Sequence, residues 1–249
     1  MKLINNPNLP DREVRTAIID ARAKEEIEEL IRNGISVIPT KEVSILEKSV
    51  AYHPDMQICH LGTESFYVLA EAADYYKNMF RRHNIDCYFF NNINSLVEQS
   101  SGKLTYPKDC RLNSALTSEW VITHTDNDLY DKINRKVIKT RQGYVKCSTC
   151  IVDTDAIITA DPSIAKAATS NGIDVCVITN EGIILDGYKN GFIGGCCGKI
   201  SKEVLAFFGN INLHKDCDEI KSFCRNHQVY CESLSNNALY DYGSLLPIV

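Results

Sequence analysis

The sequence lacks any apolar run long enough to cross a membrane, and its first residues, Met1 to Pro7, lack the apolar core of a signal peptide. It also lacks an excess of basic residues. The 27 Lys and Arg stand against 32 Asp and Glu, which gives a net charge of −5, and no basic cluster stands out. A surface that binds nucleic acid normally carries the opposite charge. We therefore expect a cytoplasmic protein that binds neither a membrane nor a nucleic acid.

No stretch rich in Pro, Gly or Ser divides the chain, so we expect residues 1–249 to form a single domain. With 44% hydrophobic residues, the chain has ample material for a core. Eleven cysteines are an odd number in a chain with no export signal, which favours reduced thiols over a disulfide framework. Many of these thiols should behave as small core hydrophobes. Those expected in strands or on apolar helix faces are Cys59, Cys87, Cys176, Cys224 and Cys231.

One stretch reads as a complete strand, helix and second strand. Residues 156–159 form a short apolar run, Asp161 is a good helix N-cap, and Pro162 suits a first helical position because it needs no N–H there. Asn171 and Gly172 are a helix stop signal, and a second apolar strand follows at 173–178.

The same order of elements recurs four more times along the chain. The copies span 17–38, 57–88, 120–147 and 205–231. Their expected helices carry apolar residues at the spacing of a half-buried helix, at 23–31, 66–80, 129–137 and 220–224. Such a repeat predicts five similar units. The alternative is an ordinary doubly wound α/β sheet.

The segments between the copies would each add a strand, and they carry most of the polar and reactive residues. In residues 50–55, His53 and Asp55 would share one strand face, which places a proton donor beside an anion. Pro54 fits better at a strand end or bulge, and the alternative is a turn that Asp55 caps. In residues 111–116, the polar Asn113 interrupts an apolar run.

Two cysteine pairs call for different interpretations. Cys147 and Cys150 form a CxxC without the second pair that zinc normally needs and without the following helix of a redox dithiol, so we interpret them as two thiols at a strand end. Cys196 and Cys197 stand among glycines in residues 191–199. Backbone there must turn or be approached closely, and its N–H groups could hold a thiolate or an anion. These two are either a nucleophile or buried thiols in a tight turn.

With five units and these residues, the sequence resembles the guanidino-group modifying enzyme superfamily. Its pentein fold sets five ββαβ units around a pseudo-five-fold axis. The family includes deiminases, dimethylarginine hydrolases, amidinotransferases and a non-catalytic ribosome anti-association factor. The resemblance implies a nucleophilic Cys, a His within His-x-Asp and carboxylates that bind the guanidinium, with no cofactor and no metal. Carboxylates suit this task because a guanidinium stays cationic at any ordinary pH.

The family's residues carry over in part. His53 and Asp55 match the His-x-Asp in type but come early in the chain, and the last strand, 238–246, has Asp241 and no Cys where the family's nucleophile lies. The nucleophile would then be relocated. The candidate catalytic residues are His53, Cys196 and Cys197, and the candidate substrate-binding residues are Asp55, Asn113 and Asp241.

The resemblance therefore implies a cysteine-dependent hydrolase or transferase acting on a small guanidino or amidine compound. The alternative is a catalytically silent pentein that binds a protein or a small ligand. The repeat also makes a prediction about ring closure. The first copy lacks an upstream segment, so we expect the tail 237–248 to pair beside residues 15–20 and close the ring.

Overall fold

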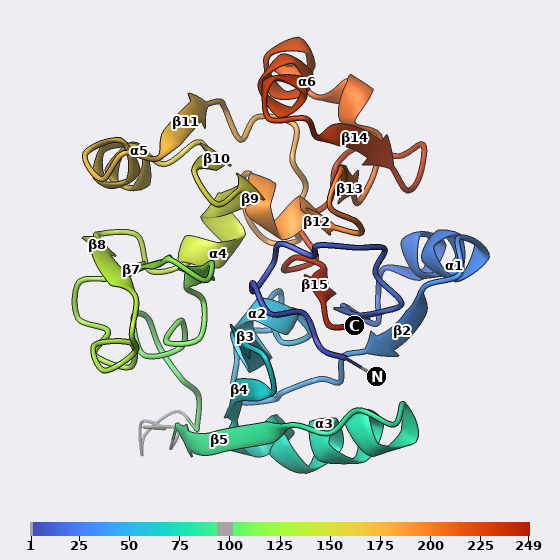
Figure 1. Cartoon of the computed structure of the whole chain (residues 1–249), viewed down its shortest axis with the longest axis vertical. Coiled ribbons are helices and arrows are strands. Elements are labelled where there is room, and N and C mark those ends of the chain that lie inside the picture. The colour runs from blue at the N-terminus through green and yellow to red at the C-terminus, as the bar shows by residue number, and fades with distance from the viewer. Residues whose placement is uncertain (1, 94–101) are drawn as a thin grey trace.

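The computed structural model describes residues 2–93 and 102–249 and arranges them as five three-stranded sheets around a central axis (Figure 1). The strand orders are β15-β1-β2, β3-β4-β5, β6-β7-β8, β11-β10-β9 and β12-β13-β14. The strands are β1 (Thr16–Ile19), β2 (Ser36–Pro39), β3 (Ile58–Gly62), β4 (Ser65–Leu69), β5 (Tyr88–Ile93), β6 (Ala115–Leu116), β7 (Trp120–His124), β8 (Lys136–Thr140), β9 (Thr149–Asp153), β10 (Ala156–Thr159), β11 (Asp174–Val177), β12 (Cys197–Lys199), β13 (Val204–Phe207), β14 (Tyr230–Ser233) and β15 (Leu246–Pro247). The helices are α1 (Lys24–Arg32), α2 (Pro54–Gln57), α3 (Ala70–Arg82), α4 (Val145–Ser148), α5 (Pro162–Thr169) and α6 (Cys217–Asn226), with 3-10 turns η1 (Ile193–Cys196) and η2 (Ile211–Leu213).

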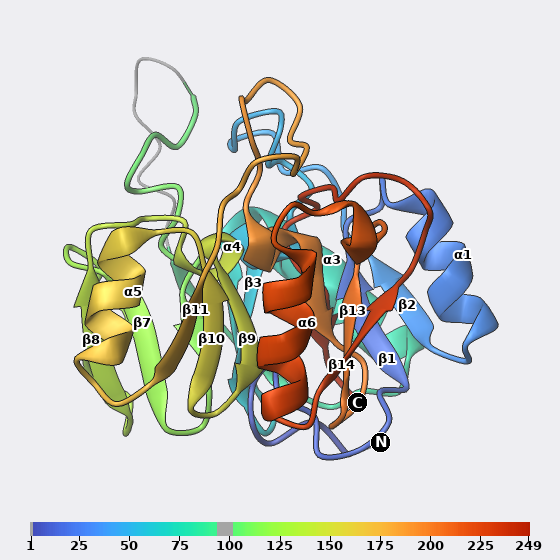
Figure 2. The ribbon, with the colours of Figure 1, turned by 90° about the horizontal axis from the view of Figure 1, so that it is seen from above.

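Every sheet follows one plan. Its inner strand runs antiparallel to the middle strand, and the middle strand runs parallel to the outer strand. In four units the connection from middle to outer strand is a helix, α1, α3, α5 or α6, and Figures 1 and 2 show these helices around the rim. This architecture confirms the five-unit prediction and excludes the doubly wound sheet. Among the described helices, none is long and apolar enough to span a membrane.

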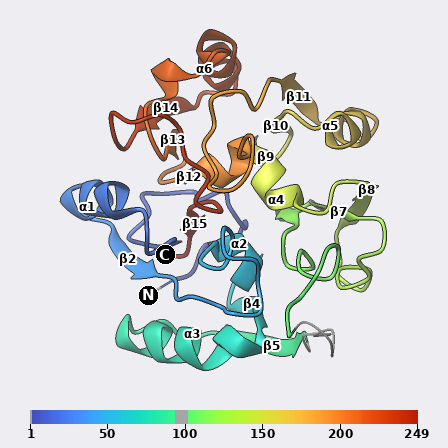
Figure 3. The ribbon, with the colours of Figure 1, turned by 180° about the vertical axis from the view of Figure 1, so that it is seen from behind.

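The tail closes the ring, as the sequence predicts. Strand β15 pairs antiparallel with β1, with Ala17 opposite Pro247 and Ile18 opposite Leu246. Ile4 N also donates to Ile248 O at 3.0 Å, so both termini meet in one unit. The view from behind shows β15 at the centre of the ring (Figure 3).

The strand, helix and strand expected in 156–178 all form, with α5 beginning at Pro162 and β11 covering 174–177 of the strand expected at 173–178. The Asp161 carboxylate caps α5 by accepting hydrogen bonds from Ser163 N at 2.8 Å and Ile164 N at 2.9 Å. The helix expected at 129–137 is wrong: residues 125–135 form turns. Asn127 Oδ1 accepts from Leu129 N at 3.2 Å, and such local side-chain bonds compete with helix formation.

The second unit also differs from the prediction in its boundaries. Phe66 and Leu69 were expected on a helix, but they lie in β4, and α3 begins only at Ala70. The run Phe66-Tyr67-Val68 is aromatic and β-branched, which suits a pleated, half-buried surface.

The expected strands at 50–55 and 142–147 are wrong, because short helical turns stand there. Pro54 takes the first helical position of α2, where its missing N–H costs nothing, and β3 starts at Ile58. Helix α4 likewise precedes β9, and η1 precedes β12. These turns carry side chains to the axis where the inner strands begin.

Candidate functional site

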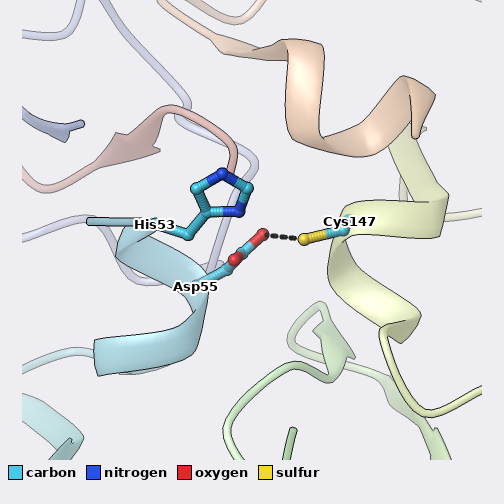
Figure 4. Close-up of side chains that lie close together, drawn as sticks. All are labelled: His53, Asp55 and Cys147. Carbon is cyan, nitrogen blue, oxygen red and sulfur yellow. Dashed lines mark hydrogen bonds between the residues drawn. The ribbon is translucent and has the colours of Figure 1, made fainter. Parts of the chain in front are cut away.

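Three reactive side chains from two helical turns meet at the axis of the ring. His53 and Asp55 come from the start of α2, and Cys147 comes from α4 (Figure 4). One ligand atom from each lies within 4.8 Å of the others. Cys147 Sγ donates a hydrogen bond to Asp55 Oδ2 at 3.0 Å. A thiol, an imidazole and a carboxylate are thus in reach of one another.

Two further polar side chains hold this cluster in place. Asn113 Oδ1 accepts from Cys147 N at 3.1 Å, and Asn113 Nδ2 lies 3.2 Å from Cys147 Sγ. Ser244 Oγ donates to Asp55 Oδ2 at 2.7 Å. Four of the five sheets contribute to the cluster. His53 and Asp55 precede β3, Asn113 precedes β6, Cys147 precedes β9 and Ser244 precedes β15.

Asp241 faces His53 from the segment that precedes β15. Its Oδ1 lies 3.9 Å from His53 Nδ1. Backbone N–H groups hold the carboxylate: Phe192 N donates to Oδ2 at 2.9 Å and Gly243 N donates to Oδ1 at 3.0 Å. A second carboxylate is therefore held in a fixed position near the imidazole.

Glycines allow the turns to approach this closely. A Cβ at Gly195 would overlap the Asp241 carboxylate, and one at Gly194 would overlap the carbonyl oxygens of Lys146 and Thr149. The glycines of residues 191–198 are thus required by close backbone approach, as the sequence suggested.

The central cluster is sealed from solvent, and burial sets its protonation. His53, Asn113, Asp241 and Ser244 are fully buried, and Asp55 and Cys147 are each 2% exposed. Burial raises the pKa of Asp55 to about 6. Burial, and then the Asp55 charge, raise the pKa of Asp241 to about 7. Burial and the Arg22 cation lower the pKa of His53 to about 3, so the imidazole is neutral.

The resting thiol is protonated, and the imidazole makes no well-formed hydrogen bond. Burial, followed by the Asp55 carboxylate, raises the pKa of Cys147 well above its ordinary value. Among the described residues, neither ring nitrogen of His53 has a hydrogen-bond partner, and Asp55 Oδ1 has none either. Unsatisfied buried polar atoms are rare and costly, and they often mark a functional site.

Cys196 and Cys197 lie outside this cluster. Their thiols donate to carbonyl oxygens of their own turn, Cys196 Sγ to Phe192 O at 3.1 Å and Cys197 Sγ to Ile193 O at 3.3 Å. The cysteine that joins His53 and Asp55 is Cys147, whose place in the sequence predicts only a thiol at a strand end. Both Cys147 and the His53–Asp55 pair come just before an inner strand, and this shared position was the available signal.

The same three side chains are the set that could hold a metal ion in the described part of the chain. Zinc binds imidazole nitrogen, thiolate sulfur and carboxylate oxygen. In the present arrangement, however, Cys147 is a protonated donor to Asp55, whereas a ligand to zinc must be a thiolate. Binding of an ion would therefore require Cys147 to lose this proton.

Asp55→Asn is expected to change how stability depends on pH. The folded state holds the Asp55 proton more tightly than the unfolded chain does, so this carboxyl's contribution to the free energy of unfolding is lost as the pH rises through about 6. A pKa moved from near 4 to about 6 corresponds to about 3 kcal/mol. As the pH rises from about 4 to about 8, the free energy of unfolding of the variant should therefore increase by about that much relative to that of wild type.

Urea denaturation at several pH values measures this difference. Groups far from the cluster cancel, whereas the pKa of Asp241, which the Asp55 charge raises, should fall in the variant and add to its gain. Asp128→Asn, at a side chain that is 78% exposed, is the matched control. A difference between wild type and Asp55→Asn that stays constant with pH would contradict the raised pKa.

Comparison with known proteins supports the fold. A family model described as a family of unknown function, DUF6873, matches residues 18–246. Among curated proteins, no sequence matches significantly. An inosamine-phosphate amidinotransferase from Streptomyces griseus is 9% identical with a TM-score of 0.59, over 97% of this chain and 95% of that chain.

Two further solved structures are similar over most of their length. An agmatine deiminase from C. jejuni is 6% identical with a TM-score of 0.55, over 94% of this chain and 90% of that one. An amidinotransferase from Microseira wollei, of the saxitoxin biosynthetic pathway, is 10% identical with a TM-score of 0.53, over 92% of each chain. The chain therefore has the pentein fold of guanidino-group modifying enzymes, as its sequence predicts.

Proposed function

The chain belongs to DUF6873, a family of unknown function, and we propose that it is a cysteine-dependent enzyme that cleaves a C–N bond in a small guanidino or amidine compound. Cys147 is the proposed nucleophile and His53 the proton carrier. One observation carries the proposal: Cys147, His53 and Asp55 converge, with ligand atoms within 4.8 Å, on the axis of a pentein fold. The similar amidinotransferases and deiminase add support through their fold.

The chemistry follows from the charges around the cluster. A guanidinium is cationic, so Asp55 and Asp241 would hold its N–H groups. Its positive charge beside Cys147 would lower the pKa of the thiol, which is high in the resting site. Binding of the substrate would thereby create the nucleophile. A neutral amide would bring no such charge.

The reaction then proceeds in two halves. Cys147, whose thiol donates to Asp55 in the resting site, passes its proton by way of that carboxylate to the neutral His53, and the thiolate attacks the central carbon to form a C–S bond. The C–N bond breaks, and the leaving nitrogen takes the electron pair together with the proton from His53. Water in a hydrolase, or an amine in a transferase, then attacks the carbon. As it attacks, the water or amine gives up a proton to His53. The C–S bond then breaks, and the sulfur takes the electron pair and that proton, which restores the thiol of Cys147.

A second candidate is a catalytically silent protein that binds a guanidino ligand or a protein. It is favoured by the sealed cluster and by the protonated, hydrogen-bonded state of Cys147. The two candidates differ in whether Cys147 becomes reactive when a cation binds.

A charge-matched pair of alkylating agents tests the proposal. Chloroacetamidine and chloroacetamide carry the same electrophilic carbon, but only the amidine is cationic. We expect chloroacetamidine to alkylate Cys147 at least about tenfold faster, which corresponds to about 1.4 kcal/mol of attraction to the carboxylates. Peptide mapping by mass spectrometry identifies the labelled cysteine.

Two variants serve as controls. Cys147→Ser should remove the adduct, and Asp241→Asn should reduce the preference for the amidine. A panel of guanidino compounds, assayed for released ammonia or amine, then identifies the substrate. Equal rates for both reagents at Cys147, together with a ligand-induced rise in Tm, would contradict the enzyme and support the silent binder.

A further inference from the structure

Asp20 is a fully buried carboxylate that holds a guanidinium from its own chain. It follows β1 directly, and its side chain has no exposed surface. Arg22 Nε donates to Asp20 Oδ1 at 3.0 Å, and Arg22 Nη2 donates to Asp20 Oδ2 at 2.6 Å. This two-pronged geometry fits a planar guanidinium and does not fit an ammonium.

Two other groups complete a cradle around the same guanidinium. Ser49 O accepts from Arg22 Nη2 at 3.0 Å. The Arg22 Cζ atom lies 5.1 Å from the centre of the Tyr52 ring, at a distance where the π-face attracts a cation. A buried carboxylate, a carbonyl and an aromatic face together recognise a guanidinium, and Arg22 itself is 31% exposed, so its outer side meets solvent.

Arg22 lines a surface pocket, and its charge reaches the central cluster. A pocket of about 300 Å³ is lined by Arg22, Tyr240 and Tyr242 among others, and the two tyrosine rings stack with centroids 4.3 Å apart. Tyr240 and Tyr242 flank Asp241 in the sequence, as Tyr52 precedes His53. The Arg22 charge helps to lower the pKa of His53, so the two sites lie within electrostatic reach.

We propose that Asp20, Tyr52 and Ser49 O form a guanidinium-binding subsite that Arg22 occupies in the resting protein, and that a small guanidino ligand entering through this pocket takes its place. Arg22 would then act as a resident plug between this pocket and the buried Asp20 carboxylate. Binding at the cradle does not depend on the proposed function. A passage of the ligand onward to Cys147 would rest on that function. The ligand class is a small alkylguanidinium.

Substitution of Arg22 tests the subsite in the full chain. Arg22→Ala leaves the Asp20 carboxylate buried without its partner, so the variant should melt at a lower temperature than wild type. Methylguanidinium chloride at low millimolar concentration should restore a large part of that Tm and bind saturably in calorimetry. Methylammonium chloride, a cation of equal charge without the planar fork, should give a shift at least about threefold smaller.

Three variants separate specific filling of the cradle from general salt effects. In Arg22→Ala with Asp20→Asn, the rescue by methylguanidinium should disappear. Arg12→Ala removes an arginine whose ion pair with Asp11 is exposed, and it should show no rescue. Arg22→Gln keeps the stem of the side chain and removes the charge, so the same titration applies if the Ala variant does not fold.

The outcomes also separate this inference from the enzyme hypothesis. Equal shifts with both cations in the Arg22 variants would overturn the subsite, even with selective alkylation of Cys147. Rescue by methylguanidinium that depends on Asp20 would support the subsite, even if Cys147 proves inert. In that case the enzyme hypothesis alone would fail.

Discussion

Deletion of residues 245–249 is expected to abolish the folded state under conditions where the full chain is stable. The deletion removes β15, which closes the first sheet against β1. It removes four apolar side chains that are at most 5% exposed, Leu245, Leu246, Ile248 and Val249. At about 1.5 to 3 kcal/mol for each buried side chain, the loss is comparable to the whole stability of a domain, about 5 to 15 kcal/mol.

The loss extends beyond hydrophobic burial. Thr16 O accepts from Ile248 N at 2.9 Å, and Ile248 O accepts from Ile4 N at 3.0 Å, so the deletion exposes backbone of β1 and of the N-terminal segment. An open edge of this kind favours aggregation. Circular dichroism, a thermal melt and size-exclusion chromatography measure the effect.

A point substitution provides an intermediate case with the tail in place. Ile248→Ala, at a fully buried side chain, should lower the free energy of unfolding by about 2 to 5 kcal/mol. Leu213→Ala, at a residue that is 62% exposed, is the matched control and should have little effect. A truncated chain that melts like the full chain would show that closure by the tail does not stabilise the ring.

Gly195→Ala is expected to give the second-largest effect, a loss of more than about 3 kcal/mol of stability. The added methyl group would overlap Asp241 Oδ1. The carboxylate cannot easily move away, because Phe192 N and Gly243 N both donate to it. Relief of the overlap would therefore break hydrogen bonds to a buried charge. Chemical denaturation measures the loss.

A double-mutant cycle shows whether the overlap is the cause. Asp241→Ala removes the carboxylate, so Gly195→Ala should cost markedly less in that background, with a coupling of up to about 3 kcal/mol. Gly182→Ala is a useful contrast, because Gly182 has a φ of +88° and no described atom within 4 Å of its added Cβ. Its cost should be that of backbone strain alone, about 1 kcal/mol. Additive effects of Gly195→Ala and Asp241→Ala would rule out a direct clash.

The central cluster combines residues that the sequence indicated with one cysteine that it did not. The sequence indicates His53, Asp55 and Asn113 as polar residues in the segments between the copies and Asp241 as a polar residue in the last strand, and the structure brings all four into the central cluster. Cys147 was missed because residues 142–147 read as a strand, whereas residues 145–148 form the helical turn α4. A four-residue helix is too short for its periodicity to be read from sequence.

The sequence by itself determined the five units, the helix that joins the middle and outer strands in four of them, and the closure of the ring by the tail. The units follow from the apolar periodicity within each segment, and the closure follows from the strand that the first copy lacks. Both can be read from the sequence without knowledge of any long-range contact. The tertiary structure alone decided which cysteine meets His53 and Asp55. Cys147 and Asp55 are 92 positions apart, and Ser244 and Asp55 are 189 apart. Their contact depends on how far each short turn carries its side chain toward a common axis, and that distance is set by the packing of all five units.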